Sequence, residues 1–454
     1  MQIKDQHIVV AGLGQTGRAL VRFLARRGAR ITVTDSAPAG ELSDALTEIR
    51  EFGEALVGTA LGGHDPAVFA SADMIVLSPG VPHNLPPIRQ AEENSIPVIG
   101  EIELAFRFMK TPIVAITGTN GKSTATLLAG EMLKDAGFRV FVGGNLGTPL
   151  IAYADADDTA DFAVAEISSF QLDTIDRFRP QVAVLLNITA DHLDRYADFE
   201  AYIRSKGRIF ENQTGKDAAV VNRADPATEK LLPGLRARLL PFNAGPSDAA
   251  GAAVGEEYVE FRVPGQAPHT LDCRRIPLIG AHNRENIAAA GLAALAAGAS
   301  FASIRQTAGA FHGLPHRMTP VATIDGVHYI DDSKATNVDA VVRALASFST
   351  PVILIMGGRE KGGSYAALQP LLPGRVKHLV VLGEAARTIE AALGDAAPTR
   401  RAASMAEAVR IAKRHASAGD TVLLSPACAS FDMYESYAQR GDDFVQQVHE
   451  TEAD

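Results

Sequence analysis

The 454-residue chain has only two cysteines, no tryptophan and no long apolar run. Cys273 and Cys428 are too few for a disulfide framework or a cysteine-rich metal site, so we expect unreactive, buried thiols. The longest alanine-rich apolar stretch, residues 287–299, is too short to span a bilayer. The first residues lead directly into a strand-like run and lack the pattern of a secretory signal. These absences predict a cytoplasmic protein without membrane insertion.

An excess of positive charge is also missing. The 43 Lys and Arg residues against 53 Asp and Glu residues give a formal net charge of -10, and no basic tract is present. This composition argues against a nucleic-acid partner. With 46% hydrophobic and 21% charged residues, the chain has the composition of a globular protein, and its length predicts about three domains. Any anionic ligand must therefore be held by local cations and helix ends.

A glycine-rich loop between a strand and a helix is the strongest functional signal. The apolar run 113–117 ends at the sequence GTNGKST (118–124), and a helical pattern follows. This order directs backbone N–H groups and a helix N-terminus at a phosphate. The two glycines allow close approach, Lys122 adds a positive charge, and Ser123 offers a hydroxyl to Mg²⁺. The loop is two residues shorter than usual and an ordinary glycine-rich turn is the alternative, but we predict nucleotide phosphate binding.

The N-terminal residues have the pattern of a Rossmann-like domain, which we expect over residues 1–100. A β-run at 7–11 precedes GLGQTG (12–17), a helix at 19–26 and a second strand at 31–34 that ends in Asp35. Taken alone, this pattern suggests NAD and an oxidoreductase. A glycine turn with an acidic residue can equally hold another ribose-diphosphate group, so the pattern leaves the ligand open.

Two strands of a second unit, residues 101–313, end in polar side chains. The strand at 162–165 leads into Glu166, and the strand at 182–186 leads into a segment that contains His192. Because parallel sheets bind ligands at the carboxyl ends of their strands, we expect both side chains to share a crevice with the phosphate loop. Their oxygen and nitrogen atoms suit Mg²⁺ or Mn²⁺. A capping carboxylate and a structural histidine are the alternatives.

The rest of this unit carries weaker signals. Lys206 lies in a polar helix at 199–211, where the sequence alone predicts a solvated side chain. A strand is expected at 218–222, and residues 224–267 are expected to be irregular. An alanine-rich helix begins near 280, and its first polar side chains could cap the helix or hydrogen-bond a base. These side chains are His282, Asn283 and Asn286.

A third unit, residues 314–454, alternates strands with helices. Strands are expected at 327–330, 352–356, 379–382 and 421–424. Polar clusters follow three of them, at 331–337, 357–362 and 425–432. The predicted fold is therefore α/β with three domains: a Rossmann-like N-terminal domain, a central domain with a P-loop ATPase-like parallel sheet, and a Rossmann-like C-terminal domain. A substrate reached by all three implies domain closure, which excludes water.

Together these motifs resemble those of the Mur ligase family over the whole chain. The matching segments are GTNGKST (118–124), EISSFQL (166–172), NITADHLDRY (187–196), GAHNRENIAAA (280–290), HR (316–317), DDSKATN (331–337), GGREKG (357–362) and SPACASFD (425–432). The last three favour the members that add D-glutamate, and the Asp-Asn-Pro-Arg motif of the diaminopimelate-adding members is absent. The resemblance implies a monomeric ligase of peptidoglycan precursor synthesis. Its substrates would be UDP-N-acetylmuramoyl-L-alanine and D-glutamate, and its cofactors ATP and Mg²⁺.

The resemblance also implies a role for individual residues. ATP would be bound by Gly118, Thr119, Asn120, Gly121, Lys122, Ser123, Thr124, Asn283, Asn286, Arg317, Asp332 and Lys334. The UDP-linked substrate would be bound by Gly14, Gln15, Thr16, Asp35, Ser36 and Asn145, and D-glutamate by Thr336, Lys361, Ser430, Phe431 and Tyr437. Metal ligands would be Ser123, Glu166, His192 and a carbamylated Lys206. The catalytic set would be Lys122, Glu166, His192 and Lys206.

The implied reaction uses no covalent nucleophile of the protein. The alanyl carboxylate attacks the γ-phosphate of ATP, and the amine of D-glutamate then displaces phosphate from the acyl phosphate. A nicotinamide-dependent oxidoreductase would leave the Gly-Lys-Ser-Thr sequence and Glu166 unexplained. A nucleotide-binding switch predicts slow ATP hydrolysis that amino acids do not affect. Within the family, L-glutamate or a folate-type substrate are alternatives, although the UDP-type N-terminal unit argues against folates.

Overall fold

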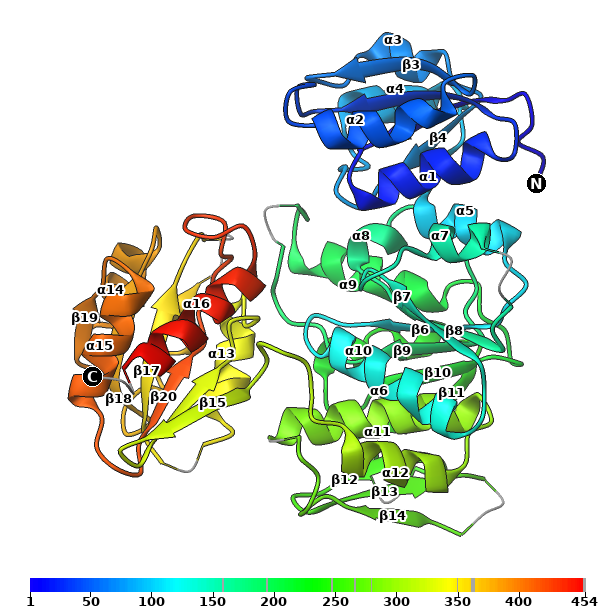
Figure 1. Cartoon of the computed structure of the whole chain (residues 1–454). Coiled ribbons are helices and arrows are strands. Elements are labelled where there is room, and N and C mark those ends of the chain that lie inside the picture. The colour runs from blue at the N-terminus through cyan, green and yellow to red at the C-terminus, as the bar shows by residue number, and fades with distance from the viewer. Residues whose placement is uncertain are drawn as a thin grey trace.

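The chain folds into three α/β units, each built around one sheet, in a computed structural model that describes residues 1–156, 159–192, 195–245, 248–264, 267–278, 280–348, 350–360 and 364–451. In Figure 1 the N-terminal unit (blue) and the C-terminal unit (yellow to red) both adjoin the central unit (cyan to green). The predicted three-domain α/β fold is confirmed. Among the described residues, no helix is both long enough and apolar enough to cross a membrane.

The N-terminal unit is a parallel five-stranded sheet in the order β3-β2-β1-β4-β5. The strand order reverses between β1 and β4, which leaves a crevice outside their carboxyl ends. Its strands are β1 (His7–Ala11), β2 (Arg30–Asp35), β3 (Leu56–Leu61), β4 (Met74–Leu77) and β5 (Val98–Gly100). Its helices are α1 (Gln15–Ala25), α2 (Ser43–Ile49), η1 (Arg50–Phe52), α3 (Pro66–Ala70) and α4 (Pro86–Glu93).

The central unit has a nine-stranded sheet in the order β14-β13-β12-β11-β10-β9-β6-β8-β7. Its strands are β6 (Ile113–Thr117), β7 (Val140–Gly144), β8 (Phe162–Glu166), β9 (Val182–Leu185), β10 (Ala218–Asn222), β11 (Arg238–Phe242), β12 (Gly251–Val254), β13 (Tyr258–Arg262) and β14 (His269–Asp272). Its helices are α5 (Glu101–Phe108), α6 (Lys122–Asp135), α7 (Leu150–Asp155), α8 (Ser169–Leu172), α9 (Phe199–Gly207), η2 (Arg208–Phe210), α10 (Pro226–Glu229), η3 (Leu232–Gly234), α11 (Ala281–Ala296) and α12 (Phe301–Ala310).

The prediction that residues 224–267 are irregular is wrong. This segment contains β11, β12 and β13, and the last two pair antiparallel at the edge of the sheet. The strands are short and rich in residues of low β-propensity, such as Gly251 and Ala252 at the start of β12. Their strand conformation depends on pairing with neighbours that a local pattern does not reveal.

The C-terminal unit has a six-stranded sheet in the order β15-β16-β20-β17-β18-β19, with β15 antiparallel to β16 and the remaining pairs parallel. Its strands are β15 (Thr319–Ile324), β16 (Val327–Asp331), β17 (Val352–Gly357), β18 (Val376–Leu382), β19 (Thr399–Arg401) and β20 (Thr421–Leu424). Its helices are α13 (Val338–Leu345), η4 (Tyr365–Ala367), α14 (Ala386–Leu393), α15 (Met405–His415) and α16 (Tyr437–Glu450).

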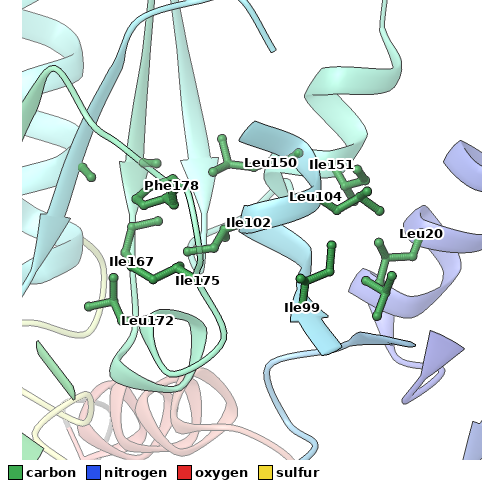
Figure 2. Close-up of a cluster of buried hydrophobic side chains, with 14 of the residues drawn as sticks. Leu20, Ile99, Ile102, Leu104, Leu150, Ile151, Ile167, Leu172, Ile175 and Phe178 are labelled. Atoms are coloured by element: carbon green, nitrogen blue, oxygen red, sulfur yellow. The ribbon is translucent and has the colours of Figure 1, made fainter. Parts of the chain in front are cut away.

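The two boundaries of the central unit differ in chemistry. One hydrophobic cluster runs from Leu20 of α1 through Ile102 of α5 to Phe178 of the central unit, as Figure 2 shows. None of the hydrophobic clusters formed by described residues joins the central unit to the C-terminal unit. Burial of apolar surface therefore holds the first boundary, whereas polar contacts hold the second.

Candidate active site

The site begins at the carboxyl edge of three adjacent strands. β6 pairs in parallel with β8 on one side and with β9 on the other. The loop after β6, Glu166 at the end of β8 and the segment after β9 therefore emerge at the same edge of the sheet. The backbone N–H of Thr119 donates to the carbonyl of Asn187 (2.9 Å), which ties two of these segments together. This is the arrangement that the strand-end pattern predicts.

The phosphate loop needs its glycines for two different reasons. Gly118 and Gly121 have φ angles of 157° and 86°, which side chains disfavour. A Cβ atom at Gly121 would lie 2.3 Å from the Oδ1 of Asn286, so this glycine lets α11 approach the loop. Lys122 begins α6, and its Nζ donates to the carbonyls of Gly118 and Thr119 (2.9 Å each). Burial lowers the pKa of Lys122, and the charges of Glu166 and Asp191 oppose that shift.

Lys206 is not the solvated side chain that its helix predicts. It is 1% exposed, and its Nζ donates to the carbonyl of Gly118 at 2.8 Å, the same oxygen that Lys122 contacts. Burial lowers the pKa of Lys206 well below its usual value, and the nearby charge of Lys122 lowers it further. The environment therefore favours a neutral amine, which is nucleophilic.

Glu166 keeps one carboxylate oxygen without a protein partner. Its side chain is buried, and Oε1 accepts a hydrogen bond from Nδ2 of Asn145 at 2.8 Å. Oε2 is buried and has no partner among the described residues. Ser123 is also buried, and its hydroxyl accepts a hydrogen bond from Nζ of Lys334 at 3.3 Å. An unpaired buried carboxylate oxygen fits a hard cation, because such an oxygen otherwise costs desolvation energy.

The neighbours of His192 include Phe170 and Asp191. Its backbone is left-handed (φ 55°), and its ring centroid lies 4.8 Å from that of Phe170. Its Nε2 is 3.7 Å from a carboxylate oxygen of Asp191. Within the described ranges, no three His, Cys, Asp or Glu side chains form a ready metal site.

A narrow cavity lies between the phosphate loop and the C-terminal unit. Six of the residues predicted to bind ATP line it: Asn120, Gly121, Asn286, Arg317, Asp332 and Lys334. Leu186, Phe242 and Ala340 add apolar wall, and His282 also lines the cavity. Burial lowers the pKa of His282 to about 4, so its imidazole is neutral. The cavity thus combines cations, amides and an apolar surface, as a nucleotide requires.

The capping interpretation of the first residues of α11 is wrong. The N-cap is Gly280, and no side chain caps it. Asn283 and Asn286 are buried, and Asn286 donates to Oδ1 of Asn283 at 3.2 Å. On the opposite wall, burial raises the pKa of Asp332 to about 7, and its two oxygens accept from Ser425 and from the Met318 backbone. The cavity walls are therefore ordered by internal hydrogen bonds.

A second cavity, of about 1010 Å³, lies between the N-terminal and central units. All six residues predicted to bind the UDP-linked substrate line it: Gly14, Gln15, Thr16, Asp35, Ser36 and Asn145. Asp35 orders the cavity, because its carboxylate accepts from the backbone N–H groups of Leu13 (2.7 Å) and Ala37 (2.9 Å). His64 also lines the cavity. No sequence pattern indicates His64, since a single histidine after a strand forms no motif.

The residues predicted to bind the amino acid are only partly brought together. Thr336 lines a third cavity, of about 1260 Å³, together with His192. Ser430 is buried, whereas Phe431 is 62% exposed beside a separate surface depression. Tyr437 lies near Lys334, whose Nζ is 4.9 Å from its ring centroid. Lys361 falls outside the described residues. The predicted amino-acid site is therefore dispersed in this conformation.

One buried arginine that the sequence did not indicate ties three site loops together. Arg440 of α16 is 2% exposed, and burial lowers its pKa to about 10. Its guanidinium donates to the carbonyls of Ser333 (2.8 Å), Gly357 (3.4 Å) and Cys428 (3.1 Å), which follow or end three different strands. A lone arginine in a polar helix normally indicates a solvated side chain. Only the tertiary structure shows that it connects these loops.

The cysteines differ slightly from expectation. Cys428 is buried, and burial raises the pKa of its thiol to about 11, next to the Tyr365 hydroxyl at 3.2 Å. Cys273 is only partly buried, and desolvation raises its pKa as well. Both thiols are therefore protonated at neutral pH and poor nucleophiles.

Glu101 provides a pH-dependent test of the boundary between the N-terminal and central units. It is buried at the start of α5, and Oε1 accepts from the Ile151 backbone at 2.7 Å. Burial raises its pKa from 4.5 to about 7, against hydrogen bonds from Ile151 and Gln171. The folded state thus binds the proton more tightly, so this contribution to stability is complete below pH 4.5 and is lost as pH rises to about 7.

We expect E101Q to gain unfolding free energy relative to the unmodified chain over that window, by about 3 kcal/mol, and to show no further gain at higher pH. Chemical denaturation at several pH values measures the difference. The exposed Glu131, which pairs with Lys134 at 2.8 Å, supplies the control variant E131Q. Parallel pH profiles for E101Q and E131Q would contradict the assignment.

Comparison with known proteins identifies relatives over the whole chain. Three family models match: "Mur ligase MurD-like, N-terminal domain" at residues 6–100, "Mur ligase middle domain" at 116–294 and "Mur ligase, glutamate ligase domain" at 316–428. A protein of Desulfosudis oleivorans named UDP-N-acetylmuramoylalanine–D-glutamate ligase is 52% identical over 448 residues, covering 99% of this chain and 97% of that protein. A protein of the same name from Geotalea daltonii is 47% identical, covering 98% and 97%.

Solved structures share the fold at low sequence identity. A pseudomurein peptide ligase type C from Methanothermus fervidus aligns with a TM-score of 0.62 and 20% identity, covering 98% of this chain and all of that chain. MurF from Acinetobacter baumannii aligns with a TM-score of 0.62 and 16% identity, covering 98% and 91%. At these identities the alignments support the three-domain architecture alone.

Proposed function

This chain belongs to the Mur ligase family, and from that premise we propose that it is the ATP-dependent ligase that joins D-glutamate to UDP-N-acetylmuramoyl-L-alanine in peptidoglycan precursor synthesis. The observation that carries the proposal is the cluster at Gly118. Its carbonyl accepts from both Lys122 and Lys206, and the charge of Glu166 acts on both amines. The Lys122 ammonium, the buried Lys206 amine and an unpaired carboxylate oxygen of Glu166 at the end of a phosphate loop suit the activation of a carboxylate by ATP.

Each domain has its own part in the proposed reaction. Residues 1–100 would bind the UDP end of the acceptor, residues 101–313 would bind ATP, and residues 314–454 would bring D-glutamate. The cavity lined by Asp35 and Asn145 supports the first assignment, and the cavity lined by Asn120 and Lys334 supports the second. For D-glutamate we propose Thr336, Lys361, Ser430, Phe431 and Tyr437. All five lie in the C-terminal domain, so its closure would carry them as one group towards the acyl phosphate.

Mg²⁺ fits the acceptor groups that the site leaves unpaired. Ser123 and Glu166 would hold one ion, since the free Oε2 of Glu166 and the Ser123 hydroxyl are hard oxygen donors. His192 and a carbamylated Lys206 would hold a second. When bound, the ions would neutralise charge on the phosphate oxygens. The carbamate forms when the neutral Nζ of Lys206 attacks the carbon of CO₂ and releases one proton.

The two chemical steps balance without a protein nucleophile. A carboxylate oxygen of the alanyl group attacks the γ-phosphorus, the bond to the β-phosphate oxygen breaks, and ADP leaves. The amine of D-glutamate then attacks the acyl carbon, and phosphate leaves with the oxygen that came from the carboxylate. Lys122 and the loop N–H groups position the phosphates and stabilise their charge, and domain closure keeps water from the acyl phosphate.

Phosphate release from ATP tests the proposal directly. We expect release only when UDP-N-acetylmuramoyl-L-alanine and D-glutamate are both present, and none when L-glutamate replaces D-glutamate. We further propose that the protein acts as a monomer in the cytoplasm, where ATP is available. Hydrolysis that amino acids do not affect would instead indicate a nucleotide-binding switch. Saturable binding of NADH at micromolar concentration would favour an oxidoreductase. Either result would overturn the proposed function.

A further inference from the structure

Two side chains of the C-terminal domain hydrogen-bond to the side chain of Asn120, a residue of the phosphate loop. Asn120 donates through Nδ2 to a carboxylate oxygen of Asp339 at 2.7 Å. Its Oδ1 accepts from Nδ2 of Asn337 at 3.3 Å. Asn337 is the N-cap of α13, and Asp339 lies in the first turn of that helix. In Figure 1, α13 lies on the side of the C-terminal unit that faces the central unit.

The backbone of Asn120 is fixed equally well by its own domain. Its N–H donates to Oδ1 of Asn187 at 2.8 Å, and its carbonyl accepts from Nδ2 of the same side chain at 3.0 Å. Asn187 follows β9 and is buried. Asn120 therefore joins the strand end of its own domain to the C-terminal domain, and each polar atom of its carboxamide has a protein partner.

Asp339 also belongs to a relay, a chain of polar contacts that leads through Arg343 and Glu285 to the central unit. Nε of Arg343, one turn along α13, donates to the same oxygen of Asp339 at 2.8 Å. Nη1 of Arg343 then contacts Glu285 of α11 at 3.4 Å, and Glu285 also accepts from Asn243 at 3.0 Å. Arg343, Glu285 and Asn120 all line the cavity between the phosphate loop and the C-terminal unit. The relay thus crosses the domain boundary twice around one cavity.

We propose that Asp339 is a positioning residue that couples closure of the C-terminal domain to the phosphate loop through Asn120, and that Arg343 neutralises Asp339 so that its charge does not oppose bound phosphates. The inference rests on the proposed ATP site, but it gives Asn120 a different role from phosphate binding through its side chain. Because no hydrophobic cluster of the described residues crosses this boundary, polar contacts of this kind decide whether the domains stay together.

Charge and hydrogen bonding can be separated by substitution. In D339N the side chain still accepts from Asn120 but carries no charge, whereas D339A removes both. In R343A the carboxylate of Asp339 stays and loses its cation, so it repels phosphates close to the loop. Removing that carboxylate in R343A/D339N should therefore restore nucleotide affinity. Because the two side chains are in contact, their effects on stability are not expected to be additive, so nucleotide affinity is the readout that separates the two roles.

The experiment measures steady-state kinetics and, separately, direct titration with a fluorescent ATP analogue. We expect D339A to lower kcat about tenfold, D339N to stay within about threefold of the unmodified chain, and R343A to weaken nucleotide binding about tenfold. R343A/D339N should bind nucleotide more tightly than R343A. The KM for the UDP-linked substrate should change by less than about twofold in all variants, because that cavity lies at the other boundary.

Lys377 supplies the control K377A. It pairs with Asp420 at 2.6 Å, and both residues lie at the amino ends of strands of the C-terminal sheet. K377A should leave all parameters unchanged. The proposal is overturned if D339N is as impaired as D339A, if R343A/D339N binds no better than R343A, or if the KM for the UDP-linked substrate rises in parallel. The nucleotide titration tests whether the charge of Asp339 opposes ATP binding, and it does not depend on ligase activity. If the unmodified chain fails to ligate D-glutamate, the proposed function fails, and the titration still gives its own result.

Discussion

Replacing Lys122 with alanine should lower kcat about 10²-fold or more, with the fold intact. Lys122 is partly buried at the start of α6, and its amine already lies over the loop that would carry the phosphates. Such a preorganised charge stabilises the charge that develops on the transferred phosphoryl group, and the loss of one such donor typically costs this much. The measurement is the steady-state rate of phosphate release at saturating ATP.

The same helix provides the control for this prediction. Lys134 is exposed on α6 and pairs with Glu131 at 2.8 Å, so K134A should keep the rate of the unmodified chain. A surface pair of this kind contributes little to stability. Full activity of K122A would refute the role assigned to Lys122.

K206A should lose most of the activity and recover part of it when short carboxylates are added. The low pKa of Lys206 favours the neutral amine that reacts with CO₂, and the product would carry a carboxylate in place of that amine. A small carboxylate that enters the space left by the truncated side chain would supply the missing charge. Rates with and without acetate, and with bicarbonate depleted, give the result.

A spectroscopic readout separates the carbamate from a structural lysine. Labelled bicarbonate should give a carbamate carbon signal in the unmodified chain and none in K206A, while the exposed Lys216 supplies the control K216A. If neither bicarbonate depletion nor carboxylate addition changes the rates, Lys206 acts as an unmodified amine.

The fold and the centre of the site were accessible from the sequence for a physical reason. Parallel strands place their carboxyl ends at one edge, so the motif at 118–124 and Glu166 could be assigned to one crevice before their strands were seen to be adjacent. The six residues assigned to the UDP-linked substrate likewise line one cavity. A local sequence pattern is enough to place such a side chain, because its position depends on the end of its own strand.

What the sequence missed depends on contacts between distant segments. Lys206 is buried by packing of α9 on α8, although its helix looks solvent-exposed in sequence. The contact between Asn120 and Asp339 spans 219 residues, and the carbonyls that Arg440 binds come from three separate loops. No local periodicity encodes such pairs. The residues proposed for D-glutamate likewise come from separate segments of the C-terminal unit.

Transfer of an ¹⁸O label tests the central claim most directly. UDP-N-acetylmuramoyl-L-alanine labelled in its alanyl carboxylate is incubated with the ligase, ATP and D-glutamate, and the phosphate released is analysed by mass spectrometry. Activation as an acyl phosphate predicts one labelled oxygen in each phosphate released. Phosphate that carries no label, at the same rate of release, would show that ATP is hydrolysed by water and that the carboxylate is never phosphorylated.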